Sequence, residues 1–282
     1  MNNTHTIEVD GIVQRYHVFG QGPVCVAHSG GPGISWNYLR MPLLEEHLTM
    51  VYVEPIGTGE SGRLADPAQY VLSTYVRFLH AVIEHLGEPR VALLGHSHGG
   101  FVALEYALAH PDRVGGLILH DTSPVTGPDF WQNAVANMTS FVQANQGKPG
   151  VEEIMPAFTA NHGELSDAEM TRAVRTILPG YLADYWGREA EFAPMVEQMS
   201  AWSAPSRGQE PAPFDVRPRL GEIGVPTLVA VGAHDFICGP KWGRSLADGI
   251  PGAVYVEFAN SGHMPHLEEP REFDAAVRKV LA

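Results

Sequence analysis

One stretch decides the fold: Val91-Ala-Leu-Leu-Gly95-His96-Ser97-His98-Gly99-Gly100-Phe101. It starts as an apolar run typical of a buried strand and continues as a helical pattern over 99–109. At the junction, Gly95, Ser97 and Gly99 form the motif Gly-x-Ser-x-Gly. Small residues at these positions permit a strained strand-to-helix turn that presents the serine oxygen at the edge of a sheet. We therefore predict that Ser97 is a nucleophile, the alternative being a glycine-rich turn with an incidental serine. His96 is expected to pack beneath this turn or to bond to backbone.

Further apolar runs flank this stretch on both sides. They predict strands over residues 6–13, 14–19, 24–27, 50–53, 91–94, 114–120, 227–231 and 253–258. Helical patterns lie between them, over residues 73–86, 99–109, 241–248 and 270–281. Strands that alternate with helices in this way predict a doubly wound, mostly parallel α/β sheet covered on both faces.

The alternation stops between residues 123 and 219, where strand signals are missing and helical patterns are interrupted by proline and glycine. Three of the five tryptophans lie here, namely Trp131, Trp186 and Trp202. We interpret 123–219 as a helical cap inserted into a core made of 1–122 and 220–282. The segment 204–218, rich in Pro, Ser and Gly, is expected to return the chain to the sheet. A subset of the cap aromatics is expected to roof a pocket.

A serine nucleophile needs a base, and the base needs a third group that fixes its tautomer. The strand predicted over 227–231 leads into Asp235, and the next strand leads to His263. One helix and one strand fit between the two residues, so both lie at the same edge of the sheet as Ser97. We predict His263 as the base and Asp235 as its acid. Asp121, which ends the strand before the cap, is the rival acid.

A glycine-rich loop, His28-Ser-Gly30-Gly31-Pro-Gly33, follows the third predicted strand. Glycines let backbone N–H groups come close to a substrate, so Gly31 is the predicted oxyanion donor and Gly30 a neighbouring substrate contact. The second donor is the N–H of His98, the residue directly after Ser97. The alternative for the loop is a simple tight turn.

These motifs, together with Gly57-Thr-Gly59-Glu-Ser61, resemble the α/β-hydrolase superfamily, and within it the proline iminopeptidase-like hydrolases. The resemblance covers the core on both sides of the cap. It implies the α/β-hydrolase fold and supports the catalytic triad and the oxyanion loop. Two positions depart from the family pattern: Ser29 replaces a histidine of the glycine loop, and Ile56 replaces an arginine. The resemblance therefore supports hydrolysis more than peptidase activity.

The expected reaction is cleavage of an ester, lactone or amide bond of a small, largely apolar substrate through an acyl-enzyme, without a cofactor. Alternatives are a proline iminopeptidase, a ligand receptor, or a cofactor-free lyase or oxygenase on the same fold. In proline iminopeptidases, an acidic group commonly follows the catalytic aspartate and pairs with the substrate amine. Phe236 occupies that position here and is expected to offer apolar surface to the substrate. Three carboxylates of the cap could supply the pairing instead: Asp184, Glu191 and Glu197.

The composition excludes several partners. With 18 Lys+Arg against 32 Asp+Glu, the net charge of −14 argues against binding to nucleic acids or anionic membranes. The chain shows no targeting segment and no apolar stretch long enough to span a bilayer, so a cytoplasmic location is expected. Cys25 and Cys238 form no disulfide framework. No pair of the 14 histidines has zinc-ligand spacing with an acidic partner, so no metal is expected. The predicted partner is a small-molecule substrate, and formation of a homo-oligomer is possible on this sequence.

Overall fold

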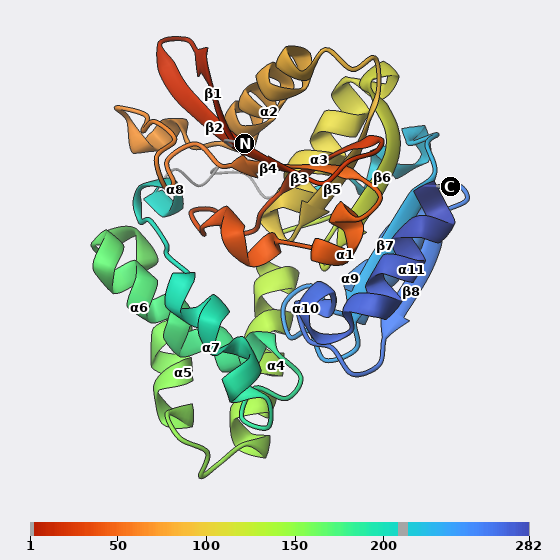
Figure 1. Ribbon diagram of the computed structural model, residues 1–282. Helices are drawn as coiled ribbons and strands as arrows, with labels where there is room; N and C mark the ends of the chain where they lie inside the picture. The colour runs from red at the N-terminus through yellow and green to blue at the C-terminus, as the bar shows by residue number, and fades with distance from the viewer. Residues whose placement is uncertain (1–2, 208–213, 282) are drawn as a thin grey trace.

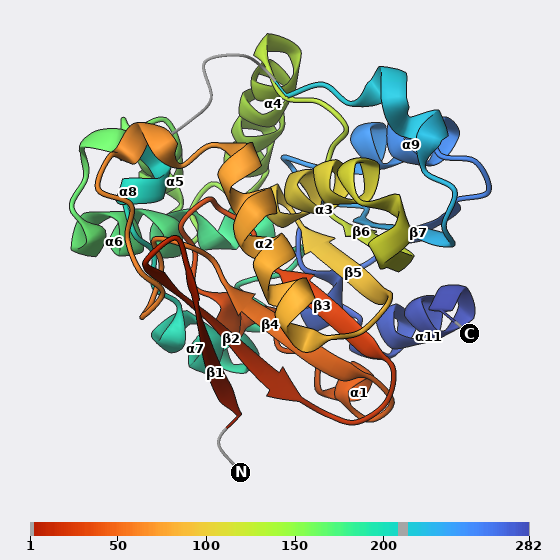
Figure 2. The ribbon, with the colours of Figure 1, turned by 90° about the horizontal axis from the view of Figure 1, so that it is seen from above.

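The computed structural model describes residues 3–207 and 214–281. Its centre is an eight-stranded sheet in the order β1-β2-β4-β3-β5-β6-β7-β8 (Figures 1 and 2). The strands are β1 Thr4–Val9, β2 Ile12–Phe19, β3 Val24–His28, β4 Thr49–Glu54, β5 Val91–His96, β6 Val114–His120, β7 Thr227–Gly232 and β8 Val254–Phe258. Strands β1, β2 and β4 pair in antiparallel fashion, and all other pairings are parallel. The predicted α/β-hydrolase architecture is confirmed.

Helices cover both faces of the sheet, which explains why its strands are continuous apolar runs. Within β3, Val26 packs into the core beneath α2 (Leu72–Leu86) and α3 (His98–Ala109), whereas its neighbours Cys25 and Ala27 pack toward the opposite face. Figure 2 shows α2 and α3 lying over the sheet. The remaining core helices are α1 Pro42–Glu45, α9 Pro240–Gly249, α10 Pro265–Glu268 and α11 Pro270–Leu281.

The first hairpin differs from the sequence prediction. The predicted break between residues 13 and 14 is wrong, because β1 ends at Val9 and β2 begins at Ile12, and these two residues pair. The connection is the dipeptide Asp10-Gly11, with φ of 51° and 77°. Two successive residues in the left-handed region make the two-residue turn that matches the twist of a hairpin, and Asp-Gly is its usual sequence.

Five α-helices lie between β6 and β7 in the described residues: α4 Pro128–Ala144, α5 Val151–Phe158, α6 Asp167–Ile177, α7 Glu189–Gln198 and α8 Ala204–Arg207. Figure 1 shows α4 to α7 together at one end of the sheet. The start and end of this helical insertion pair with each other through the isolated bridge between Val125 and Asp215. A second bridge, between Ala201 and Ile34, ties it to the loop after β3. Residues 208–213 of the predicted return segment lie outside the described residues.

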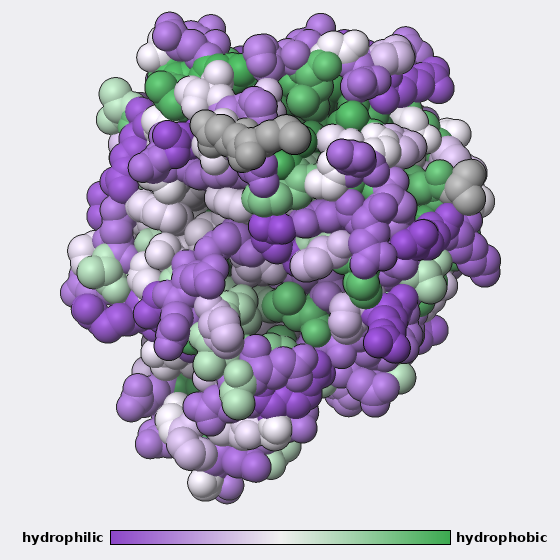
Figure 3. Space-filling model, viewed as in Figure 1, coloured by the Kyte–Doolittle hydropathy of each residue, from purple (hydrophilic) through white to green (hydrophobic). Residues whose placement is uncertain are grey.

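The surface is largely polar. Figure 3 shows hydrophilic residues over most of this face, with hydrophobic residues in scattered groups. Within residues 3–207 and 214–281, no helix combines the length and the hydropathy that crossing a membrane requires.

Candidate active site

Ser97 lies at the sharp turn between β5 and α3. Its backbone has φ 54° and ψ −121°, a strained conformation for a residue with a side chain. The turn is tight enough that a Cβ on Gly95 would collide with the carbonyl of Gly99, and one on Gly99 with the carbonyl of His28. The glycines of the motif are thus required sterically, and the strain presents Ser97 to the cavity described below.

His263 and Asp235 are joined by a hydrogen bond of 2.7 Å between Nδ1 and Oδ2, and both side chains are buried. The other carboxylate oxygen of Asp235 accepts the N–H groups of Ile237 (2.9 Å) and Cys238 (3.1 Å). Because the aspartate oxygen accepts at Nδ1, the proton of the neutral imidazole lies there and Nε2 is left as the basic nitrogen. Both His263 and Ser97 line the same cavity. The structure thus brings the three predicted triad residues to one edge of the sheet.

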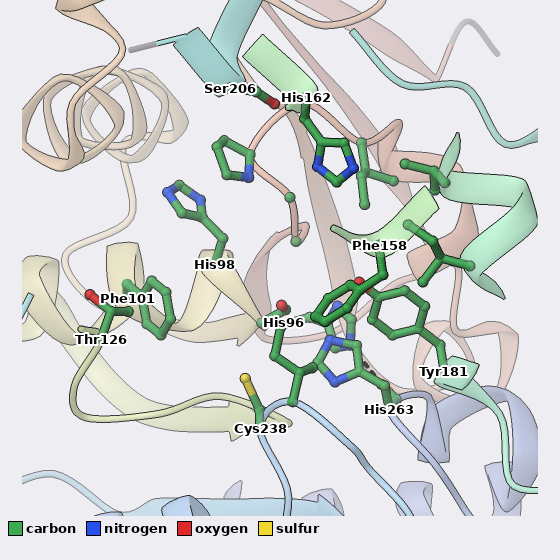
Figure 4. A pocket seen from close by; sticks show the side chains of 18 of the residues that line it. His96, His98, Phe101, Thr126, Phe158, His162, Tyr181, Ser206, Cys238 and His263 are labelled. Carbon is green, nitrogen blue, oxygen red and sulfur yellow. Dashed lines mark hydrogen bonds between the residues drawn. The ribbon is translucent and has the colours of Figure 1, made fainter. Parts of the chain in front are cut away.

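A hydrogen-bonded chain connects His263 to the glycine loop. The Nε2–H of His96 donates to the backbone carbonyl of His263 (2.8 Å), so its Nδ1 is bare and accepts the hydroxyl proton of Tyr38 (2.6 Å). The same hydroxyl oxygen accepts the N–H of Gly30 (2.8 Å). Burial lowers the pKa of His96 well below its ordinary value, which keeps the ring neutral. Figure 4 shows His96 next to His263.

These hydrogen bonds confirm one of the two expectations for His96, namely that it bonds to backbone beneath the turn. Tyr38, which lies on the short 3-10 helix Trp36–Leu39, has no part in any motif. It follows the third strand by ten residues, and this spacing in the sequence does not indicate a functional role.

The glycine loop differs in detail from the prediction. Gly30 lines the cavity and lies so close to Ser97 that an added Cβ would be 2.9 Å from the serine Cβ. Its N–H, however, already donates to Tyr38 and is not free for a substrate. Gly31, with φ 132°, also lines the cavity, and its N–H has no partner among the described residues. The N–H of His98, at the first position of α3, has no acceptor within the helix.

A cavity of about 680 Å³ lies between the triad and the helical insertion. Its walls are mostly apolar, with Phe130, Trp131, Phe158 and Tyr181 coming from the insertion (Figure 4 labels the last two). No Asp, Glu, Lys or Arg within the described residues lines it. Burial lowers the pKa of His98, on the cavity wall, to about 3, so this imidazole is neutral as well.

The prediction for Phe236 is wrong. Its side chain is buried, but it does not line the cavity. It packs edge-on behind Phe158 and Tyr181, with ring centroids 5.4 and 4.9 Å apart, and these two rings face the cavity instead. The next residues, Ile237 and Cys238, reach the cavity. The turn held by Asp235 points them there and points Phe236 into the insertion.

The carboxylates that could serve an amine site lie elsewhere. Asp184 accepts the N–H of Gly187, Glu191 pairs with Arg188 at 2.7 Å, and Glu197 is exposed. None of the three lines the cavity.

The loop that carries His263 is fastened to the helical insertion. The N–H of His263 donates to the carbonyl of Tyr181 (2.7 Å). Glu268 bridges the two parts, because its carboxylate accepts the N–H of Gly262 (2.7 Å) and that of Ala183 (2.7 Å). Burial raises the pKa of Glu268 to about 7. The position of His263 therefore depends on how the insertion packs against its loop.

In the described residues, one group of three or more His, Cys, Asp or Glu side chains has its possible metal-ligand atoms within 4.8 Å of one another: Asp235, Cys238 and His263. Two of these atoms already share the hydrogen bond of the triad. Burial raises the pKa of the Cys238 thiol well above its usual range, which disfavours the thiolate that a metal would need.

Known proteins resemble the chain over its whole length. It is 27% identical over 273 residues to a proline iminopeptidase of Lactobacillus crispatus, covering 92% of this chain and 89% of the relative. It is 29% identical over 287 residues to a 2-hydroxy-6-oxononadienedioate/2-hydroxy-6-oxononatrienedioate hydrolase of Paraburkholderia xenovorans, covering 98% and 93%. An enol-lactonase structure from Burkholderia xenovorans superposes with a TM-score of 0.74 at 23% identity, covering 98% and 99% of the two chains.

The relatives share hydrolysis but differ in the bonds that their names specify. The family model described as "alpha/beta hydrolase fold" matches residues 23–270, which include the Ser97 turn, the helical insertion and His263. The chain therefore belongs to the α/β-hydrolase fold family and is a hydrolase, similar to the proline iminopeptidases.

Proposed function

We propose that this protein is a serine hydrolase that cleaves an ester, lactone or amide bond of a small, uncharged and largely apolar substrate. His263 takes the proton of Ser97 as the serine oxygen attacks the substrate carbonyl, and Asp235 holds the imidazole in the required tautomer. The N–H groups of Gly31 and His98 stabilise the oxyanion, and His263 then activates water to release the acid.

The proposal assigns the core segments 1–122 and 220–282 to the chemistry and the helical cap 123–219 to substrate selection. The observation that carries the substrate class is the cavity wall: it is mostly apolar and holds no Asp, Glu, Lys or Arg among the described residues. A buried charge without a partner costs several kcal/mol, so a charged group on the substrate would bind poorly there.

This wall argues against two activities named among the relatives. A proline iminopeptidase must bind the protonated amine of its substrate, which calls for carboxylates that the described part of the wall does not hold. A dioate carries two carboxylates and calls for cationic partners, and the described part of the wall holds no Lys or Arg. Neutral esters, lactones and acylated amides need neither.

The test compares kcat/KM for three substrates: prolyl-p-nitroanilide, its N-acylated analogue, and a neutral p-nitrophenyl ester of similar size. We expect the neutral ester to be turned over best, and the acylated anilide to equal or exceed the free amine. If the free amine is preferred over its acylated analogue by about a hundredfold, or roughly 2.7 kcal/mol, an amine site exists and the assignment of a neutral substrate fails.

Labelling by a fluorophosphonate separates hydrolysis from the other uses of the fold. We expect the wild type to be labelled and the Ser97→Ala variant not to be. A ligand receptor or a cofactor-free oxygenase would show neither Ser97-dependent labelling nor steady turnover of the ester.

A further inference from the structure

A second carboxyl group lies beneath the triad. Asp121 follows β6 directly, next to the end of β7, and its side chain is fully buried. One oxygen, Oδ1, accepts the N–H of Gly232 (2.8 Å). The carboxyl group is also within hydrogen-bond reach of the carboxyl of Asp235. Two carboxylates at hydrogen-bond distance cannot both ionise, so the pair holds one proton between them.

The donors around the two groups decide which one holds the proton. Asp235 accepts three hydrogen bonds, from Ile237, Cys238 and His263, and each of them favours the ionised form. Asp121 accepts one, from Gly232. The charge therefore belongs on Asp235, and the proton on Asp121.

The histidines behind Asp121 lead to the same result. His266 Nε2 lies 3.1 Å from the backbone carbonyl of Tyr38 and must donate to it, so His266 Nδ1 is bare. That nitrogen accepts from Nε2 of His120 at 2.8 Å, which leaves His120 Nδ1 bare in turn. This bare nitrogen lies 2.9 Å from Oδ2 of Asp121, and neither atom makes a hydrogen bond of good geometry within the described residues. An ionised Asp121 would set a negative charge against the lone pair of His120 Nδ1, and protonation of Asp121 removes that charge.

Other titratable groups surround Asp121. His120 and His266 lie behind it, Asp235 and Cys238 follow β7, Glu268 belongs to α10, and Tyr255 belongs to β8. Burial lowers the pKa of His120 well below its ordinary value. Burial and then the charge of Asp235 raise the pKa of Asp121 well above its ordinary value.

We propose that Asp121 is a positioning residue, held as a neutral carboxylic acid that supports the Asp235 carboxylate from beneath with its hydroxyl proton. Its effect on turnover rests on the proposed function, because it acts through Asp235 and His263. Its protonation state does not, and can be measured on the folded protein alone.

The first test measures melting temperature against pH for the wild type and for Asp121→Asn. An amide has the shape of the acid and needs no proton. A carboxyl group whose pKa is raised in the folded state contributes its stability at low pH and loses it as the pH rises. We expect the melting temperature of Asp121→Asn, relative to that of the wild type, to rise by several degrees between about pH 5 and about pH 8. Asp248→Asn, on the exposed surface of α9, is the control and should keep a constant offset. A constant or shrinking difference for Asp121→Asn overturns the proposal.

The second test is turnover of a neutral ester by matched variants. Asp121→Asn can still accept from Gly232 and donate toward Asp235, so kcat should stay within about threefold of the wild type. The same change at Asp235 gives the wrong imidazole tautomer and should lower kcat a thousandfold or more. Asp121→Leu removes the donor and should lower kcat at least about tenfold with little change in KM.

A loss in Asp121→Asn as large as that in Asp235→Asn would overturn the positioning role. If Asp121→Leu does not fold, the melting curves and the kcat of Asp121→Asn decide whether the proposal holds. If the wild type hydrolyses no ester, the proposed function fails, and the melting curves still decide the protonation of Asp121.

Discussion

Tyr38→Phe isolates the hydrogen-bonded chain between the base and the glycine loop. The substitution removes one oxygen and leaves the ring in place. Two buried groups then lose their partner, namely Nδ1 of His96 and the N–H of Gly30. Each buried polar group without a partner costs about 1–3 kcal/mol, so the loss of two partners should lower the free energy of unfolding by roughly 2–6 kcal/mol. At about 2–4 °C per kcal/mol, the melting temperature should fall by roughly 4–24 °C.

The chain offers a matched control in Tyr75→Phe. Tyr75 is as buried as Tyr38, at 2% against 4% exposed, and its hydroxyl has no hydrogen-bond partner among the described residues. Removing that hydroxyl should leave stability unchanged or raise it slightly, since an unsatisfied polar group disappears. Urea unfolding of the two variants measures the difference directly. If the urea midpoints of the two variants coincide, the hydroxyl of Tyr38 and its hydrogen bonds do not contribute to the stability of the fold.

Turnover gives the second measure of Tyr38→Phe. Without the hydroxyl, the His96 ring, which donates to the carbonyl of His263, is anchored at one nitrogen instead of two, and Gly30 is free to shift beside Ser97. A displacement near 1 Å at a reacting centre costs up to about a hundredfold, so kcat for a p-nitrophenyl ester should fall about tenfold or more with a smaller change in KM. Tyr75→Phe should keep its kcat, and an equal loss in both variants would contradict the explanation.

Ser97→Ala should fold normally and lose a thousandfold or more in kcat, because triad residues act as a unit; retention of about a tenth of the activity would contradict the nucleophile. Glu268, with its pKa raised to about 7 by burial, binds a proton on folding, so its contribution is complete below the unfolded pKa and declines as the pH rises through 7. The melting temperature of Glu268→Gln, relative to that of the wild type, should therefore rise between about pH 5 and pH 8. A difference that does not change with pH would contradict this expectation. Trp131, on α4, lines the cavity, and its side chain is 48% exposed to solvent. Trp131→Ala should lower kcat/KM about tenfold for long acyl esters and little for acetate, corresponding to roughly 1.4 kcal/mol of lost apolar contact; equal losses for both esters would place Trp131 away from the acyl chain.

Much of the architecture follows from local patterns in the sequence. Apolar runs that alternate with helices predict the parallel sheet, and the motif around Ser97 identifies the turn because glycine is sterically required there. Asp235 and His263 could be placed because each follows a strand of the same sheet, and parallel strands end at one edge. The hairpin break was misplaced because apolar alternation runs through Val13, whereas the turn chemistry lies at Asp10-Gly11.

What the sequence could not predict depends on side-chain direction and on contacts between distant segments. Phe236 directly follows Asp235, yet the hydrogen bonds that hold Asp235 turn it away from the cavity. Tyr38 contacts Gly30 and, 58 positions further along the chain, His96 through its hydroxyl, and no local pattern marks it. The pairing of β6 with β7, which brings Asp121 under Asp235, appears only once the register of the strands is known.

The bridge between Val125 and Asp215 has a consequence for how this enzyme can diversify. A segment whose two ends are held side by side acts as a cassette, since its length and sequence can change without moving the strands that it interrupts. The proposed nucleophile, acid and base are encoded outside that cassette, and most of the apolar roof inside it. Recombination or drift within one contiguous stretch of the gene thus explores new substrates while the reaction itself is inherited unchanged. At the histidine loop, such an exchange must preserve the contacts of Tyr181 and Ala183.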